Sequence, residues 1–211
     1  MLNKTIALFR FLVEKDSFER YYNSHLAKRL IYSRSVSDDA ERNMLAKFKI
    51  EAGAAFTKSA EGMMKDIKTS EDALVEYKRY QDRAHVVRPL ASRLSALQLL
   101  TDKSLQRAPF EMAPIICGQN NWPVTNTDTG CTLPPILLRG VEAFTAFYDQ
   151  KHSGRMLTFR SELGTVEVKT RFKARTHELT VSTHGLVVLA LFEGNGTDQL
   201  SYPVRSSPGS I

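Results

Sequence analysis

The fold of the N-terminal part is decided by the stretch F-E-R-Y-Y-N-S-H-L-A-K-R-L, which runs from Phe18 to Leu30. Its apolar residues recur at every fourth position, so a helix places them on one face: Phe18, Tyr22, Leu26 and Leu30. Lys28 and Arg29 lie off this stripe and point elsewhere. The pattern predicts an amphipathic helix with one face in a core.

The helical pattern continues on both sides of that stretch. Residues 3–32 contain neither Pro nor Gly and predict a single helix of about 30 residues, roughly 45 Å long, as in a bundle rod. The next helix is expected to have Asp38 as its N-cap, with Glu41 completing a capping box. Thr57 and Ser70 are expected to open further short helices, and Pro89 to interrupt the helical part.

The composition changes after a leucine stripe at residues 90–100. Prolines and glycines then mark a loop-rich crossing from Pro109 to Pro135, and a short helix is expected from Leu138 to Tyr148. Beyond it the apolar period becomes two, which predicts three strands: Leu157–Leu163, Val166–Phe172 and Leu179–Ser182. Residues 186–192 fit either a strand or a helix, and the flanking Ser182-Thr183 and Gly194-Asn195-Gly196 favour a helix.

These elements predict an α+β protein with three parts. Residues 1–108 would form a helical bundle, residues 109–202 a small antiparallel or mixed sheet with covering helices, and residues 203–211 a tail. No run is long enough to cross a membrane, and the N-terminus lacks the regions of a secretory signal. Two cysteines do not make a disulfide framework, which indicates a reducing intracellular compartment.

Signals for catalysis and for cofactors are weak throughout the sequence. There is no Gly-rich phosphate loop, no G-x-S-x-G and no H-E-x-x-H. The histidines are scattered, and Cys117 and Cys131 have no second pair nearby, so neither a zinc site nor a cysteine nucleophile is expected. The acidic cluster Asp38, Asp39 and Glu41 is typical of a helix start. We therefore expect a protein without enzymatic activity, cofactor or metal.

The net charge of +6 and the pI of about 9.3 favour acidic partners. Basic residues crowd the first two helices, Lys28, Arg29 and Arg34 among them. Two interpretations remain open for these residues. They are either an ordinary solvated face or a landing surface that speeds the association of an acidic partner.

Several short strings, in a shared order and spacing, carry a resemblance to a known family. They are the opening stretch, then Ser37–Glu41, Met44-Leu45, Lys47–Gly53, Phe56-Thr57, Glu61–Met63, Lys65-Asp66, Trp122-Pro123, Leu133-Pro134, Phe147-Tyr148, His152–Thr158, Leu163–Thr165 and Leu179–Thr183. Together they resemble the cullin family, the elongated scaffolds of multisubunit ubiquitin ligases. The sequence departs from the family at Ala52, Ala60 and His184–Leu186, in the longer segment 81–106, and after Tyr202.

The resemblance implies a noncatalytic role in ubiquitin-dependent protein degradation, in the cytoplasm or the nucleus. The family's α/β part docks a RING-box protein, which adds a strand to the cullin sheet. The natural host residues here would be Leu157, Phe159, Val166, Val168, Phe172, Leu179 and Val181. A ubiquitin-conjugating enzyme would join indirectly, with its acidic tail attracted by Lys28, Arg29 and Arg34.

The resemblance also implies what this chain would not do. The repeats that bind a substrate adaptor and the winged helices that carry the modifier-accepting lysine are absent from it, so no adaptor and no such lysine are expected. One rival is a basic helical module that binds nucleic acid, although recognition motifs are missing and the polar faces carry mixed charge. Another rival is a truncated remnant without a function. The pattern does not distinguish cullin subtypes.

Overall fold

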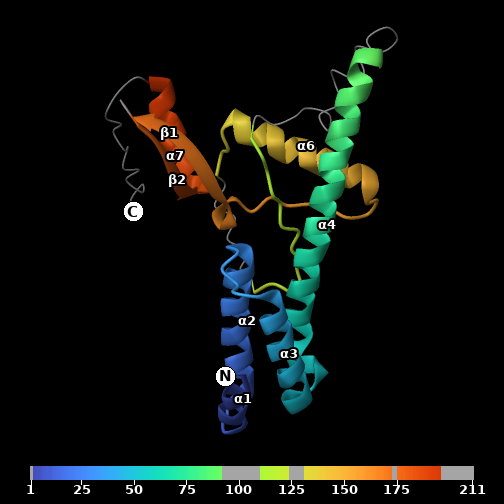
Figure 1. Cartoon of the computed structure of the whole chain (residues 1–211), viewed down its shortest axis with the longest axis vertical. Helices are drawn as coiled ribbons and strands as arrows, with labels where there is room; N and C mark the ends of the chain where they lie inside the picture. The colour runs from blue at the N-terminus through green and yellow to red at the C-terminus, as the bar shows by residue number, and fades with distance from the viewer. Residues whose placement is uncertain (1, 92–109, 124–130, 173–174, 196–211) are drawn as a thin grey trace, which may run out of the picture. The chain divides into compact units, whose positions relative to one another are not determined.

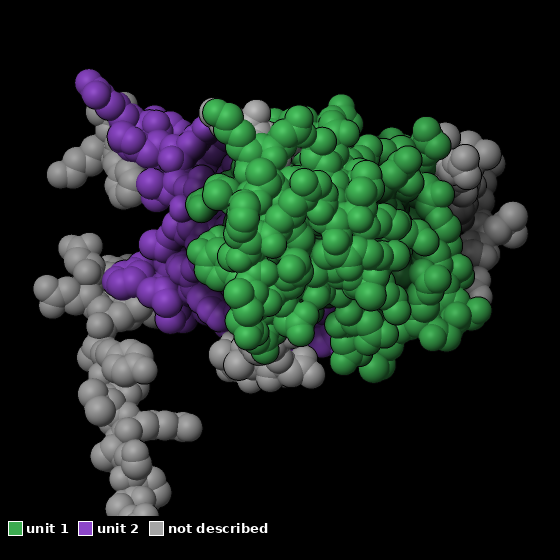
Figure 2. Space-filling model, turned by 90° about the horizontal axis from the view of Figure 1, so that it is seen from below, with its two compact units in different colours: residues 1–127, 139–157 green, residues 128–138, 158–211 purple. Residues whose placement is uncertain are grey.

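The structure is a computed structural model and describes residues 2–91, 110–123, 131–172 and 175–195. The chain divides into two compact units, residues 1–127 with 139–157 and residues 128–138 with 158–211 (Figure 2). The elements in order are α1 (Leu2–Arg10), α2 (Lys15–Ile31), α3 (Asp38–Ala52), α4 (Ala54–Ala91), α6 (Pro135–Lys151), the 3-10 turn η2 (Ser161–Leu163), β1 (Thr165–Phe172), β2 (Arg175–Ser182) and α7 (Thr183–Asn195), as Figure 1 shows. The predicted α+β class is confirmed.

The opening stretch forms α2 and buries the predicted face. Leu26 is 0% exposed, Leu30 is buried, and both pack with Leu45 of α3 and Met63 of α4. Burial of one such side chain contributes about 1.5–3 kcal/mol. The predicted helical stripe therefore packs α2 into a core that it shares with α3 and α4.

The expectation of one helix over residues 3–32 is wrong. The chain turns after α1, where the N–H groups of Phe11 and Leu12 donate to the carbonyls of Leu8 and Phe9. The turn lets the rings of Phe9 and Phe18 both reach Phe48, at centroid distances of 4.9 and 5.7 Å. Tertiary packing of these rings prevails over a sequence that has no helix-breaking residue.

The start of α3 lies one residue from the prediction. Ser37, rather than Asp38, is the N-cap, and its Oγ accepts a hydrogen bond from the Ala40 N–H at 3.4 Å. The Glu41 side chain does not complete a capping box, because it faces α2 and binds Arg29 there. The helix ends at Gly53, whose φ of +90° suits glycine.

Helix α4 is continuous from Ala54 to Ala91, so the breaks predicted at Thr57, Ser70 and Pro89 are wrong. The Thr57 hydroxyl donates to Glu61 Oε1 at 2.9 Å, and the Ser70 hydroxyl donates to the Asp66 carbonyl at 2.7 Å. Both hydroxyls are thus satisfied inside the helix, as mid-helix Ser and Thr often are. The predicted leucine stripe at 90–100 falls on residues whose side chains lie outside the described part.

The second half of unit 1 is held by an aromatic cluster. Phe144 and Phe147 of α6 both lie 5.2 Å from the ring of Tyr77 on α4, and Tyr148 and Leu157 complete the cluster. The helix predicted for Leu138–Tyr148 is confirmed and extends further at both ends. The predicted boundary after residue 108 lies outside the described residues and stays a prediction.

Unit 2 contains an antiparallel hairpin followed by α7. Strand β1 pairs with β2 from Thr165↔Ser182 to Phe172↔Arg175, and α7 contacts both strands. The strand expected at Leu157–Leu163 is wrong, because residues 157–160 are irregular and Ser161–Leu163 is the η2 turn. Leu157 packs into the Tyr77 cluster of unit 1. Alternation of apolar and polar residues does not by itself form a strand, because a strand also needs a neighbouring strand to pair with. The helical interpretation of residues 186–192 is confirmed by α7.

Helix α4 has 38 residues and is therefore longer than a helix needs to be to cross a membrane. None of the helices in the described part of the chain contains a stretch apolar enough to cross a bilayer.

Helix α2 ends in a Schellman turn that has a serine where glycine is usual. Ser33 has φ of +50°, its N–H donates to Leu30 O, and the Arg34 N–H donates to Arg29 O at 2.8 Å. Ser33→Gly removes the left-handed strain of a Cβ, and part of this gain is lost to the greater freedom of the unfolded chain. We expect the free energy of unfolding to rise by about 0.5 kcal/mol, measured by urea denaturation.

The matched control for this change is Ser59→Gly, which introduces glycine into the interior of α4. That variant is expected to lower the urea midpoint because glycine is a poor helix former. A midpoint for Ser33→Gly at or below that of the unchanged chain would contradict the prediction.

Candidate functional site

The β1–β2 hairpin has two chemically different faces. Val166 lies opposite Val181 and Val168 opposite Leu179, and these four side chains are half-buried on the side where α7 packs. The other face is polar and exposed, with Lys169 Nζ 3.1 Å from Glu178 Oε1 in the directly opposite position. The hairpin therefore has one apolar face and one solvent-facing ion pair, as expected for a half-covered antiparallel sheet.

The predicted sheet surface is only partly brought together. Val166, Val168, Leu179 and Val181 share one face, and Phe172 has the same strand parity, although its side chain is outside the described part. Leu157 instead belongs to the core of unit 1. Phe159 lies in the irregular segment before η2 and is 50% exposed, so it is not a sheet residue.

Each strand of the hairpin has one neighbour within the described residues. Each strand therefore presents an outer edge whose N–H and C=O groups can pair with an added strand. A hairpin of two strands is marginally stable by itself, and here it rests on α7. This open edge, supported by one helix, is the geometry that strand addition requires.

Helix α7 is fastened to the turn before β1. The Thr183 N–H donates to the Gly164 carbonyl at 3.0 Å, and Ser161 Oγ lies 3.3 Å from His184 Nε2. A Cβ at Gly164 would lie 2.3 Å from Thr183 Oγ1, so a larger residue here would displace the Thr183 hydroxyl. Further along, α7 exposes a group of large apolar side chains: Val188, Leu189, Leu191 and Phe192.

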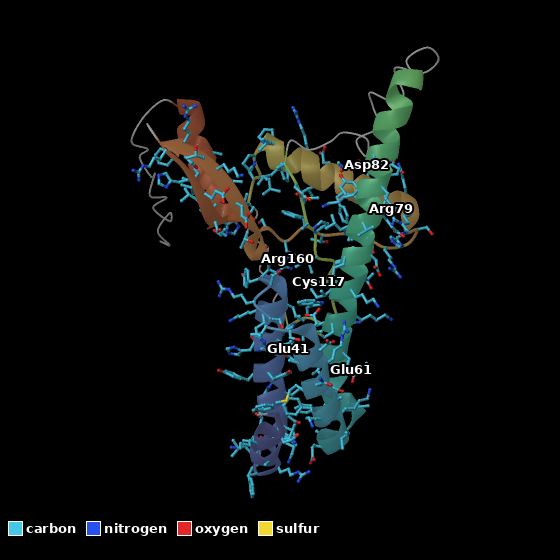
Figure 3. All side chains as sticks on the ribbon, in the orientation of Figure 1. Glu41, Glu61, Arg79, Asp82, Cys117 and Arg160 are labelled. Atoms are coloured by element: carbon cyan, nitrogen blue, oxygen red, sulfur yellow. The ribbon has the colours of Figure 1, made fainter. Side chains whose placement is uncertain are left out.

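The structure divides the predicted basic residues into two groups. Lys28 and Arg34 are exposed, and Arg34 Cζ lies 5.6 Å from the Tyr32 ring. Arg29 makes a bidentate ion pair with Glu41, Nε to Oε1 at 2.7 Å and Nη2 to Oε2 at 3.0 Å. Its charge is therefore largely neutralised between α2 and α3, where Figure 3 places Glu41.

Sequence reasoning missed the role of Glu41. Its carboxylate accepts hydrogen bonds from Arg29, from the Tyr22 hydroxyl at 3.3 Å and from Ser35 Oγ at 3.4 Å. Burial, followed by the nearby Glu41 charge, raises the pKa of Tyr22 to about 12. The sequence did not indicate this role, because Glu41 lies near a helix start and its partner Tyr22 is nineteen residues away.

A second missed residue is Asp66 of α4, which holds residues 118–122 against that helix. Its Oδ2 accepts hydrogen bonds from the Gly118 N–H at 2.8 Å, from Trp122 Nε1 at 2.8 Å and from Asn121 Nδ2 at 3.2 Å. Nearby, Ser70 Oγ accepts a hydrogen bond from the Ile116 N–H at 2.8 Å. The sequence contains both Lys65-Asp66 and Trp122-Pro123, but nothing in it indicates that they touch.

The surroundings of Cys117 disfavour its thiolate. Cys117 reaches the surface, but the protein atoms around its sulfur and, secondarily, the Asp66 carboxylate raise the pKa of its thiol to about 11. Among the described residues, no three His, Cys, Asp or Glu side chains gather as a metal ion would need. Cys117, labelled in Figure 3, is therefore protonated at neutral pH and a poor nucleophile.

An open strand edge and exposed basic residues are features typical of surfaces that bind other proteins. The family model of the cullin alpha solenoid domain matches residues 1–74, and that of the cullin alpha+beta domain matches residues 116–204. The chain belongs to the cullin family, the non-catalytic scaffolds of cullin-RING ubiquitin ligases, as the sequence strings predict.

Individual relatives give the same result. The chain is 40% identical to a cullin-3 of Dictyostelium discoideum over 193 residues, which is 91% of this chain and 22% of that protein. It is 38% identical to cullin-3B of Arabidopsis thaliana (96% and 24%) and 38% identical to cullin-4A of Mus musculus (93% and 23%). The chain thus spans less than a quarter of the length of these curated relatives.

The thiol chemistry predicts slow alkylation of Cys117. In a Cys131→Ser background at pH 8, the folded chain should react with iodoacetamide roughly tenfold more slowly than the chain in urea, because its smaller thiolate fraction outweighs the greater nucleophilicity of a thiolate with a high pKa. Quenched samples analysed by mass spectrometry give both rates. Equal rates in the folded and unfolded chain would show that the thiol is not perturbed.

The Asp66 network predicts a loss of stability on charge removal. Asp66→Asn keeps the shape but removes the negative charge that strengthens these three hydrogen bonds, so the free energy of unfolding should fall by about 1–3 kcal/mol. Urea denaturation followed by the fluorescence of Trp122, the single tryptophan, measures the change. Asp72→Asn, an exposed change on the same helix, is the control and should have little effect.

Proposed function

We propose that this chain is the part of a cullin scaffold that holds a RING-box protein and that it performs no covalent chemistry itself. The partner adds a strand to the edge of the β1–β2 hairpin, and a ubiquitin-conjugating enzyme is recruited through that partner. The role is in ubiquitin-dependent protein degradation. The observation that carries the proposal is the two-stranded hairpin, which has an open edge and rests on a single helix.

The basic residues support a secondary part of the proposal. Lys28 and Arg34 are exposed and face solvent from the end of α2, so they can attract the acidic tail of a ubiquitin-conjugating enzyme. Arg29 contributes less, since its guanidinium is held by Glu41. The proposed site of action is the cytoplasm or the nucleus, and the two free thiols suit such reducing compartments.

The strand-addition proposal is tested with paired proline substitutions. Successive N–H groups of a strand point to opposite edges. One of the substitutions Glu167→Pro and Val168→Pro therefore breaks a hydrogen bond between β1 and β2, and the other removes a donor only from the outer edge of β1. The same holds for Thr180→Pro and Val181→Pro on β2. Circular dichroism identifies the variants that keep their fold, and co-purification with a RING-box protein measures binding.

We expect one outer-edge proline that keeps the fold to abolish RING-box capture, because it removes a ladder donor and blocks close approach. Glu19→Ala on α2 is the bundle control and should keep capture. If every folded proline variant captured the RING-box protein normally, strand addition would be wrong. A folded unchanged chain without affinity for a RING-box protein would favour the remnant alternative over the scaffold.

A further inference from the structure

The connection between α2 and α3, residues 32–37, is an exposed segment that carries three serines: Ser33, Ser35 and Ser37. None of its residues is buried, and Val36 is 101% exposed. The chain here is neither helix nor strand. A modifying enzyme that binds its substrate in an extended form can therefore reach this segment, whereas a side chain in the middle of a helix is harder to present.

The sequence that follows Ser35 is acidic. Asp38 and Asp39 stand at the third and fourth positions after it, Glu41 stands at the sixth, and both aspartates are exposed. Protein kinases choose among serines by the pattern of charges around them, and carboxylates on the C-terminal side complement a kinase whose substrate groove is basic. Ser35 therefore has the sequence context that an acid-directed serine kinase requires.

The Ser35 hydroxyl lies beside the ion pair that joins α2 to α3. Its Oγ donates a hydrogen bond to Glu41 Oε1 at 3.4 Å, and the same carboxylate oxygen accepts a hydrogen bond from Arg29 Nε at 2.7 Å. Arg29 Nη2 binds the other oxygen of Glu41 at 3.0 Å. A charged group attached to the Ser35 oxygen would thus meet the carboxylate of Glu41 and the guanidinium of Arg29 together.

We propose that Ser35 is a phosphorylation site for an acid-directed kinase and that its phosphate replaces Glu41 as the partner of Arg29. The bond from Ser35 Oγ to the terminal phosphorus of Mg-ATP forms as the bond from that phosphorus to the bridging oxygen breaks. ADP leaves with the electron pair, and the hydroxyl proton passes to the carboxylate base of the kinase. The phosphate carries a charge of about −1.5 to −2 at pH 7, so it repels Glu41 and can bind the guanidinium through two oxygens.

The exchange changes how the two helices are joined. In the unmodified chain the guanidinium of Arg29 on α2 holds a carboxylate of α3, whereas after modification it holds a phosphate of the connection. Glu41 then loses its ion pair, and the first turn of α3 is no longer fastened to α2 by it. The modification is thus a switch between two partners of one guanidinium, and it goes beyond the proposed function because it involves neither the hairpin nor the RING-box protein.

The other two serines of the segment fit the proposal less well. Ser33 has uncharged residues at the third and fourth positions after it, and Ser37 has Ala40 at the third. The Ser37 hydroxyl also has a different partner, since it caps α3 and accepts a hydrogen bond from the Ala40 N–H at 3.4 Å. A phosphate on Ser37 would take the place of a helix cap and would not start from a contact with the pair of Arg29 and Glu41.

The site itself is tested by incubating the full folded chain with an acid-directed serine kinase and Mg-ATP, followed by mass spectrometry of its peptides. We expect phosphate on Ser35, at a rate that falls at least about tenfold in Asp38→Asn with Asp39→Asn, because the charges that the kinase reads are then gone. Asp72→Asn, an exposed change on α4, is the matched control and should leave the rate unchanged. A folded chain without phosphate on Ser35, or with phosphate on Ser37 alone, would overturn the inference.

The exchange of partners is tested by urea denaturation of the unmodified chain and of the purified chain phosphorylated on Ser35. Glu41→Gln should lower the urea midpoint of the unmodified chain, because Arg29 loses its charged partner, and should not lower that of the phosphorylated chain. Arg29→Gln should lower both midpoints, since Arg29 has an anionic partner in each state. Glu71→Gln, an exposed change on α4, should act equally on the two forms. An equal loss from Glu41→Gln in both forms would show that the phosphate does not displace Glu41, and would overturn the switch.

Discussion

The helical part of this protein depends on the burial of one ring, Phe48 of α3. Phe48 is 0% exposed and contacts Phe9 of α1, Phe18 and Tyr22 of α2, and Phe56 of α4, at centroid distances between 4.9 and 5.8 Å. Most of these pairs are edge-to-face, the arrangement that aromatic quadrupoles favour. One side chain thereby connects four helices, and the turn between α1 and α2 is a consequence of it.

Polar interactions then define the surface that this core leaves outside. The pair of Arg29 and Glu41 joins α2 to α3 and removes one cation from the region that the sequence marks as basic. Lys28 and Arg34 remain exposed beside Tyr21 and Tyr32. This face of α2 therefore combines exposed rings with exposed charges.

The second unit differs from the helical part because it has only a small core. Two strands and α7 enclose a few half-buried residues, and α7 also exposes large apolar side chains. Such a unit gains stability when a further strand or apolar segment is added, since each brings hydrogen bonds or buried area. This is a physical argument for the proposed strand addition.

The sequence by itself determined the α+β class, the core face of α2, the helical state of α7 and the family, because each depends on local periodicity or on strings of adjacent residues. It also predicted β1 and β2, although β2 begins at Arg175 and not at the predicted Leu179. Tertiary structure decided what depends on distant residues. It decided the turn before α2, the continuity of α4, the irregular course of Leu157 and Phe159, the capture of Arg29 by Glu41 and the three donors on Asp66. A side chain such as Leu157 fits a strand pattern equally well, and only the position of the Tyr77 cluster placed it in a different core.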